Sequence, residues 1–250
     1  MKTKVISSLS NPIIKQILNF KKNNLFLLSS QNIIKEAIKN KFKIDTLIVL
    51  ESKIDLVDNA IKNNSEQILI VNEQIINKIN TNKKFNYVFA LVKKPPKTTS
   101  IQFNNNDKNI VLLENVQNPE NVGMIIRTML GLGYQKILLF NCANINNEKL
   151  ISSSSGYVFN ENVIEINNLD FVSKLKSLNY EIIITNLDNS SQDLIKIKNE
   201  LIDKKKIIIF GNEGKGVSNY LKQLSTISIK FNMENDVDSF NVAISSSIIG

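Results

Sequence analysis

Short apolar runs alternate with amphipathic stretches along most of this chain of 250 residues. In the first part, strands are predicted at LFLLSS (25–30), DTLIVL (45–50), EQILIV (66–71) and NYVFALV (86–92). Helices are predicted between them at QNIIKEAIKN (31–40) and LVDNAIKNN (56–64). This alternation predicts a small α/β domain.

The alternation is clearer in the second part of the chain. Strands are predicted at NIVLLEN (109–115), KILLF (136–140), NYEIIITN (179–186), KKIIIFG (205–211) and STISIKF (225–231), with helices from about Asn121 and at LDFVSKLKSLN (169–179). Apolar runs separated by helices are typical of parallel strands buried on both faces, and ligands bind outside the carboxyl ends of such strands. The predicted fold class is therefore α/β, with a parallel sheet in the C-terminal part.

The segment KKPPKTTSIQFNNNDKN (93–109) separates the two parts. It contains two prolines, several charges and a run of asparagines, without hydrophobic periodicity, so it is typical of a linker. We predict an N-terminal domain over residues 1–94, a linker over 95–109 and a C-terminal domain over 110–250.

The charge is divided at the same place. Residues 1–100 contain 17 lysines and 7 acidic residues, a net charge of +10, whereas residues 101–250 contain 14 basic and 16 acidic residues, a net charge of −2. A basic N-terminal part favours nucleic acid as the partner, although lysine-rich surfaces also arise from biased composition.

The composition excludes several kinds of site. The chain has one cysteine, Cys142, and no histidine, so neither an intramolecular disulfide nor a zinc or haem site is expected, and no metal is predicted. The first residues, MKTKVISSLSNP, do not form a signal peptide, and no run approaches the roughly 18 apolar residues of a membrane helix. We therefore expect a cytoplasmic protein.

The segment PENVGMIIRTMLGLG (119–133) contains Arg127, the only arginine among 31 basic residues. One apolar helical stripe is formed by Val122, Ile125, Ile126, Met129 and Leu130. Arg127 lies away from the centre of that stripe, so it is either a surface cation or a phosphate ligand, for which the planar guanidinium is better matched than lysine. Asn121, with Pro119 just before it, is expected at the start of the helix.

Two further segments carry candidate chemistry. IIIFGNEGKGVS (207–218) has three glycines after a predicted strand, which permit either a tight turn or close approach of backbone amides to a ligand. It matches neither the P-loop nor the dinucleotide-binding fingerprint. In NMENDVDSFNVAISSSIIG (232–250), Ser239 and Asn241 lie at the start of a short helix rich in small residues, where Ser239 fits either a helix cap or a catalytic group.

Taken in order, NVQNPENVGMIIRTMLGLG, IIIFGNEGKGVS and ISIKFNMENDVDSFNVA resemble the three signature motifs of the SpoU-type RNA 2′-O-ribose methyltransferases, a branch of the trefoil-knot methyltransferases. The resemblance covers residues 110–250, and the basic N-terminal part is similar to the ribosomal-protein-like RNA-binding domain of many members. It implies a deep trefoil knot, although knots are generally absent from proteins. It also implies S-adenosylmethionine as cofactor, RNA as partner, and a homodimer with active sites near the subunit interface.

The resemblance further implies which residues are functional. The catalytic positions would be Arg127, Asn121, Glu213, Ser239 and Asn241. The cofactor-binding positions would be Gly211, Asn212, Glu213, Gly214, Ile229, Met233, Ser239, Phe240 and Asn241. The family proposal makes the arginine the base, but a guanidinium stays protonated, so phosphate anchoring is the safer role. Glu213 would orient the arginine or receive a proton through water.

Three positions depart from the family pattern. Asn232 and Asn235 stand where a proline and a glycine are usual, and Ser152 stands where an arginine is usual. Asparagine tolerates left-handed backbone, so the turn can form with Asn235. Ser152 puts one contact with RNA or phosphate in doubt.

Three functions therefore remain open from the sequence. The first is ribose methylation of ribosomal RNA, with transfer RNA as the competing substrate. The second is a non-catalytic RNA-binding or ribosome-assembly protein on the same scaffold. The third is a nucleotide-phosphate-binding enzyme that uses GNEGKG, against which the missing P-loop ending counts.

Overall fold

The computed structural model describes residues 2–20, 25–80, 85–93, 103–104, 107–186, 191–231, 233 and 239–250. These residues form two compact units, Met1–Lys97 and Thr98–Gly250. Most of the predicted linker lies outside the described residues. None of the described helices combines the length and the hydrophobicity that a membrane span requires.

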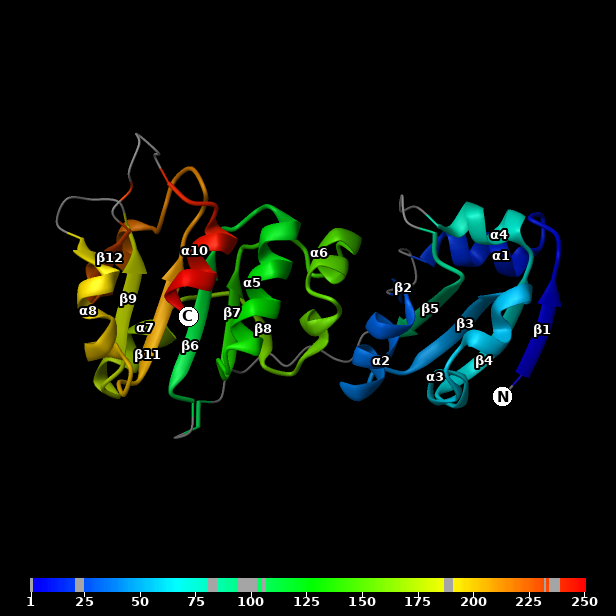
Figure 1. The fold of residues 1–250 in the computed structure, drawn as a ribbon, viewed down its shortest axis with the longest axis horizontal. Coiled ribbons are helices and arrows are strands. Elements are labelled where there is room, and N and C mark those ends of the chain that lie inside the picture. Colours follow the sequence, from blue (N-terminus) through cyan, green and yellow to red (C-terminus); the bar gives the residue numbers. More distant parts are fainter. Residues whose placement is uncertain are drawn as a thin grey trace. The chain divides into compact units, whose positions relative to one another are not determined.

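The N-terminal unit is a five-stranded mixed sheet with helices on both faces (Figure 1). Its elements are β1 (Lys2–Ile6), α1 (Pro12–Leu18), β2 (Leu25–Ser29), α2 (Gln31–Lys39), β3 (Ile44–Leu50), η2 (Glu51–Leu56), α3 (Asn59–Asn63), β4 (Ser65–Val71), α4 (Glu73–Ile79) and β5 (Val88–Lys93). The strand order is β1-β4-β3-β5-β2, with β1, β4 and β3 parallel and β5 antiparallel to its neighbours. α1 and α4 bury their isoleucines together against one face of this sheet.

The C-terminal unit is built on seven parallel strands in the order β10-β12-β9-β11-β6-β7-β8. Its elements are β6 (Asn109–Glu114), α5 (Pro119–Gly131), β7 (Lys136–Phe140), α6 (Glu148–Ser153), η3 (Tyr157–Phe159), β8 (Val163–Ile166), α7 (Phe171–Ser177), β9 (Glu181–Thr185), β10 (Gln192–Asp193), α8 (Leu194–Leu201), β11 (Lys206–Phe210), α9 (Asn219–Leu224), β12 (Ile227–Lys230) and α10 (Val242–Ile249). The predicted α/β class with a parallel sheet is confirmed.

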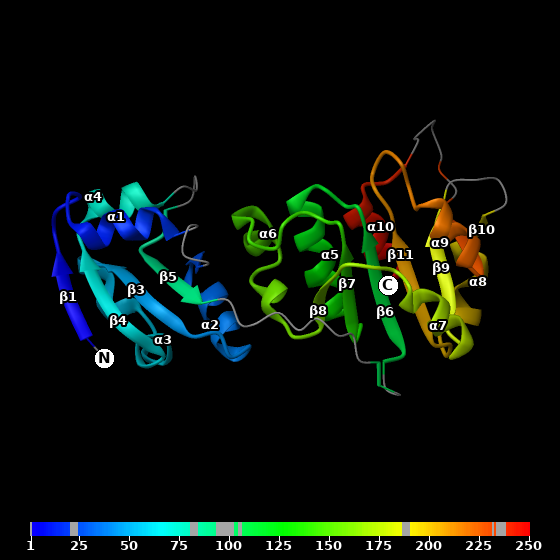
Figure 2. The ribbon, with the colours of Figure 1, turned by 180° about the vertical axis from the view of Figure 1, so that it is seen from behind.

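Helices cover both faces of the parallel sheet, which explains why its strands are continuously apolar. α5 and α10 lie against one face in Figure 1, and α7 lies against the opposite face, seen from behind in Figure 2. The predicted stripe of α5 is buried at Val122, Ile125, Ile126 and Met129. Apolar burial of this kind supplies most of the stability of a helix in a folded protein.

The start of α5 differs from the sequence prediction. Asn118 is the N-cap, because its side chain accepts hydrogen bonds from the backbone N–H groups of Glu120 and Asn121, and Pro119 occupies the first helical position, where no N–H is needed. Asn121 therefore lies in the first turn, as predicted, but the expectation that it caps the helix is wrong. Its side chain is free to bond elsewhere.

The N-cap of α10 also differs from the prediction. The side chain of Asn241, not that of Ser239, accepts the hydrogen bond from the N–H of Ala243. The cap interpretation of Ser239 is therefore wrong, because a closer residue supplies the acceptor.

α5 and α6 approach each other so closely at Gly123 that no side chain fits between them. A Cβ at this position would lie 2.6 Å from the carbonyl oxygen of Leu150 and would overlap the hydroxyl of Ser153. Gly131, at the other end of α5, has no atom within 4 Å of the same added group. The structure therefore leaves room for a side chain at Gly131 but not at Gly123.

We expect Gly123→Ala to lower the free energy of unfolding by about 1–3 kcal/mol, because the two helices must move apart. The matched variant Gly131→Ala should be neutral or stabilising by about 0.5–1 kcal/mol, because it lowers the entropy of the unfolded chain. Urea unfolding followed by circular dichroism measures both. Equal midpoints for the two variants would contradict the close packing of α5 on α6.

Candidate active site

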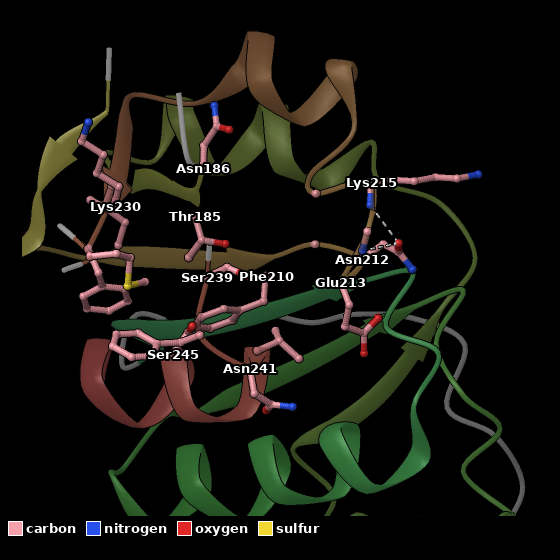
Figure 3. Close-up of a pocket in the computed structure, with 18 of the residues that line it drawn as sticks. Thr185, Asn186, Phe210, Asn212, Glu213, Lys215, Lys230, Ser239, Asn241 and Ser245 are labelled. Carbon is pink, nitrogen blue, oxygen red and sulfur yellow. Dashed lines mark hydrogen bonds between the residues drawn. The ribbon is translucent and has the colours of Figure 1, made fainter. Parts of the chain in front are cut away.

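A pocket of about 450 Å³ lies at the carboxyl ends of three adjacent strands, β12, β9 and β11 (Figure 3). Its walls are residues 185–186 at the end of β9, residues 210–216 at the end of β11 and in the loop that follows, Lys222 of α9, residues 229–231 and 233 at and after the end of β12, and residues 239–242 and 245 at the start of α10. Because parallel strands end at the same edge of a sheet, loops distant in sequence meet here.

The pocket gathers every residue predicted to bind the cofactor. These residues are Gly211, Asn212, Glu213, Gly214, Ile229, Met233, Ser239, Phe240 and Asn241. Figure 3 shows the side chains of Glu213 and Asn241 on one side of the pocket and that of Lys230 on the other. The second and third motifs therefore form a single surface.

Asn121 joins the first motif to the other two. Its side chain is only 5% exposed. Its Nδ2 donates to Oε1 of Glu213 at 3.1 Å, and its Oδ1 accepts from Nδ2 of Asn241 at 3.1 Å. A buried amide is stable only when its polar atoms are hydrogen-bonded, so this chain of two bonds fixes all three side chains.

The side chain of Asn212 holds the loop that carries Glu213. Its Nδ2 donates to the carbonyl of Asn115 at 2.9 Å, and its Oδ1 accepts from the N–H groups of Gly214 and Lys215, each at 3.0 Å. The backbone of Asn212 also exchanges two hydrogen bonds with Gly216. Asn212 therefore shapes the pocket wall and anchors it to the end of β6.

The same loop depends on a residue that the sequence analysis missed. Glu114, the last residue of β6, is 1% exposed, and its Oε2 accepts a hydrogen bond of 2.8 Å from the backbone N–H of Ser218. This bond joins β6 to the start of α9, directly after the glycine-containing loop. A carboxylate at the end of an otherwise apolar strand is the sequence signal that could have identified it.

Arg127 lies elsewhere on the C-terminal unit. Its exposed side chain donates from Nη1 to Oγ of Ser155 at 3.1 Å, the one hydrogen bond it makes within the described residues. It lines a second cavity, between the C-terminal half of α5, residues 133–135 and residues 157–162. Arg127 follows Asn121 by six residues on α5, which is about 9 Å along the helix axis.

The expectation that Glu213 orients Arg127 is therefore wrong within one chain, since Glu213 is bonded to Asn121 instead.

Of the three positions that depart from the family pattern, Ser152 is exposed on α6. Asn232 and Asn235 lie outside the described residues.

Charge in and around the pocket is mainly positive. Lys215, Lys222 and Lys230 contribute to its walls, together with the carboxylate of Glu213. Nearby, burial raises the pKa of the Cys142 thiol to about 12, and Glu213 adds to that shift. The thiol is therefore protonated at neutral pH, and it is not an activated nucleophile.

Residues 108–250 match the SpoU rRNA Methylase family. This chain belongs to that family. The match covers more than half of the chain and contains all three motifs that meet at the pocket. The deep trefoil knot predicted from the sequence is consistent with this membership.

Known proteins similar to this chain are RNA methyltransferases. An uncharacterized tRNA/rRNA methyltransferase of Borreliella burgdorferi is 35% identical over 144 residues, which are 56% of this chain and 60% of that protein. The 23S rRNA (guanosine(2553)-2'-O)-methyltransferase RlmP of Bacillus subtilis is 23% identical over 232 residues, 91% of this chain and 88% of that protein. This chain thus spans less than two thirds of the first relative's length.

Solved structures support the fold over almost the whole chain. The AdoMet-bound rRNA methyltransferase from Sinorhizobium meliloti has a TM-score of 0.83 and 23% identity, and the match covers 99% of this chain and 95% of that one. At this identity the likeness concerns the fold.

Gly211 marks the tightest part of the pocket wall. A Cβ at Gly211 would overlap backbone atoms of Gly216 and Val217, whereas a Cβ at Gly214 would meet only Oδ1 of Asn212 at 3.7 Å. We expect Gly211→Ala to lower the free energy of unfolding by about 1–3 kcal/mol, because backbone must move. Gly214→Ala should change it by less than about 0.5 kcal/mol. Thermal unfolding of both variants checks this, and an unaffected Gly211→Ala would contradict the observed loop closure.

Proposed function

We propose that this protein transfers a methyl group from S-adenosylmethionine to a ribose 2′-hydroxyl of RNA. The observation that carries the proposal is the hydrogen-bond chain from Asn241 through Asn121 to Glu213 at the edge of the pocket. It joins side chains from all three motifs, since Asn121 is 92 residues from Glu213 and 120 residues from Asn241, and the match to the family contains all three.

The pocket fits the cofactor in size and in chemistry. Its volume of about 450 Å³ lies within the usual range of small-molecule sites. Phe210, Ile229 and Phe240 offer apolar surface to an adenine ring, and the glycine-containing loop offers backbone groups to its polar edge. Lys215 and Lys222 offer cations to the carboxylate of the methionine part. When bound, S-adenosylmethionine supplies a methyl group on a positively charged sulfur.

Glu213 would act on the ribose. Its carboxylate is exposed, and the bond from Asn121 holds it at the pocket wall, so it can accept a hydrogen bond from a 2′-hydroxyl. Alignment of the hydroxyl oxygen with the methyl group supplies much of the rate enhancement, and removal of the hydroxyl proton to Glu213, directly or through water, supplies more. Ser239 and Asn241 would position the ribose beside it.

A second copy of the chain would bring Arg127 to the pocket. α5 and α10 pack on one another, and large apolar side chains on these helices and directly beside their ends stay exposed, namely Met124, Leu132, Phe240, Ile244 and Ile248. Apolar surface of this extent is typical of a protein interface. A homodimer through these two helices would place Arg127 of one chain beside the pocket of its partner, where it would anchor an RNA phosphate.

Ribosomal RNA is the favoured substrate. The Bacillus subtilis relative, which matches over nine tenths of this chain, acts by its name on 23S rRNA. The basic N-terminal unit would supply attraction for the RNA backbone, since phosphate contacts by lysine provide affinity without sequence selection.

The direct test is incubation of the protein with labelled S-adenosylmethionine and total RNA from cells that lack it. We expect label in a 2′-O-methylnucleoside of 23S rRNA, identified by nuclease digestion and mass spectrometry. Label in tRNA alone would move the substrate to tRNA. Calorimetry with S-adenosylmethionine and with ATP tests the alternative functions. Binding of S-adenosylmethionine without labelled ribose in any RNA would contradict the proposed reaction. Binding of ATP but not of S-adenosylmethionine would favour a nucleotide-binding enzyme.

Arg127→Ala and Glu213→Gln should each be nearly inactive, because one loses the phosphate anchor and the other the proton acceptor. When equal amounts are mixed and allowed to exchange subunits, up to about one quarter of wild-type activity should return, because half of the dimers are mixed and each has one intact site. Sedimentation shows whether the variants dimerise. Dimers that exchange without any recovery would overturn the assignment of Arg127 to the partner's pocket.

A further inference from the structure

The second cavity lies at the opposite edge of the parallel sheet from the first pocket. Its volume is about 510 Å³, and it is formed where β7 and β8 begin, beside the C-terminal half of α5. It shares no lining residue with the pocket at the carboxyl ends of the strands. A role in methyl transfer within the same chain therefore does not account for it.

Tyr134 is a buried polar side chain of this cavity. It is 5% exposed, and its hydroxyl makes no hydrogen bond with any described residue. Burial raises its pKa to about 12, so the hydroxyl keeps its proton and can donate it to a ligand. The hydroxyl oxygen is not among the buried side-chain atoms that lack a partner, so it reaches the cavity, where water or a bound ligand can accept its proton.

Tyr157 forms an aromatic wall of the cavity. Its neighbours Val158 and Phe159 in η3 are buried, and their packing fixes the short helix while Tyr157 stays 36% exposed. A rigid, accessible ring of this kind is a stacking surface for a nucleobase.

The other lining residues favour a negatively charged ligand that also forms hydrogen bonds. Arg127 uses one N–H group on Ser155, so most of its donor fork is available. Asn160 and Asn162 add amide groups, and none of the described lining residues is acidic. Lys136, whose Nζ lies 3.4 Å from Oδ1 of Asn162, adds a second positive charge nearby.

We propose that the second cavity binds an unpaired nucleotide of the substrate RNA. Tyr157 stacks on the base, Arg127 binds the adjacent phosphate, and the hydroxyl of Tyr134 donates to the base or ribose. This nucleotide is distinct from the one methylated in the same chain, because the two sites lie at opposite edges of the sheet. The proposal rests on the proposed function in that its ligand is RNA, a ligand whose unpaired bases are commonly recognised by stacking.

The chain contains no tryptophan, so Tyr157→Trp introduces a single fluorescent reporter into the cavity. Titration with adenosine 5′-monophosphate and with a short single-stranded RNA should quench its emission, because the base stacks on the indole. Inorganic phosphate should leave the emission unchanged. The matched control is Tyr220→Trp on α9, where the tyrosine is 44% exposed outside both cavities, and its emission should stay constant.

Tyr134→Phe and Arg127→Lys, each combined with Tyr157→Trp, test the other two contacts. Loss of the hydroxyl should weaken nucleotide binding roughly 3- to 10-fold, and Tyr157→Ala should weaken RNA binding by the full effect of one stacked base, roughly 5- to 100-fold. Arg127→Lys should weaken binding of the monophosphate and leave binding of adenosine unchanged.

RNA binding, followed independently by anisotropy, without quenching of Tyr157→Trp would overturn the proposal, as would equal quenching of Tyr220→Trp. The outcome is independent of the methyl-transfer assay. If RNA quenches Tyr157→Trp but no RNA is methylated, only the proposed reaction is contradicted. If RNA is methylated but Tyr157→Trp is not quenched, only nucleotide binding in the second cavity is contradicted.

Discussion

The buried amide of Asn121 is the contact on which the arrangement of the first pocket depends. Its oxygen and nitrogen are each committed to a side chain from a different loop, at a site that water scarcely reaches. An apolar residue there would leave Glu213 and Asn241 without their shared partner, and a charged residue would have to be desolvated. The three segments are therefore held together by one small polar side chain.

Much of the scaffold that presents this contact could be predicted from the sequence, because it depends on local periodicity. The apolar stripe of α5 and the buried strands follow from repeats of about 3.6 residues and from short apolar runs. Capping was less predictable. Asn118, Asn121 and Asn241 have equal intrinsic ability to cap, and only the tertiary structure decides that Asn118 bonds to its own helix, that Asn121 bonds across to other segments, and that Asn241 does both.

Other features depend on contacts that no local pattern contains. The motifs indicated that Arg127 and Glu213 belong to one family signature, but they gave no information on whether the two meet in one chain. The second cavity combines a buried tyrosine, an exposed tyrosine and an arginine from three segments without a common motif. Glu114 contributed a weak signal, since a carboxylate that ends an apolar strand must find a donor once it is buried.

The helix α5 carries Asn121 and Arg127 and borders the second cavity. Its 13 residues span about 20 Å, with Asn121 in the first turn, Arg127 near the middle and the second cavity beside its C-terminal half. The close approach at Gly123 fixes this helix against α6, so the spacing along it is set by the helical rise. Because Arg127 itself lines the second cavity, the distance between its guanidinium and the ring of Tyr157 constrains which nucleotide enters, since a rigid helix cannot adjust to a ligand of different spacing. Lysines elsewhere can attract the polyanion from many directions, whereas the single guanidinium fixes one phosphate in a defined orientation.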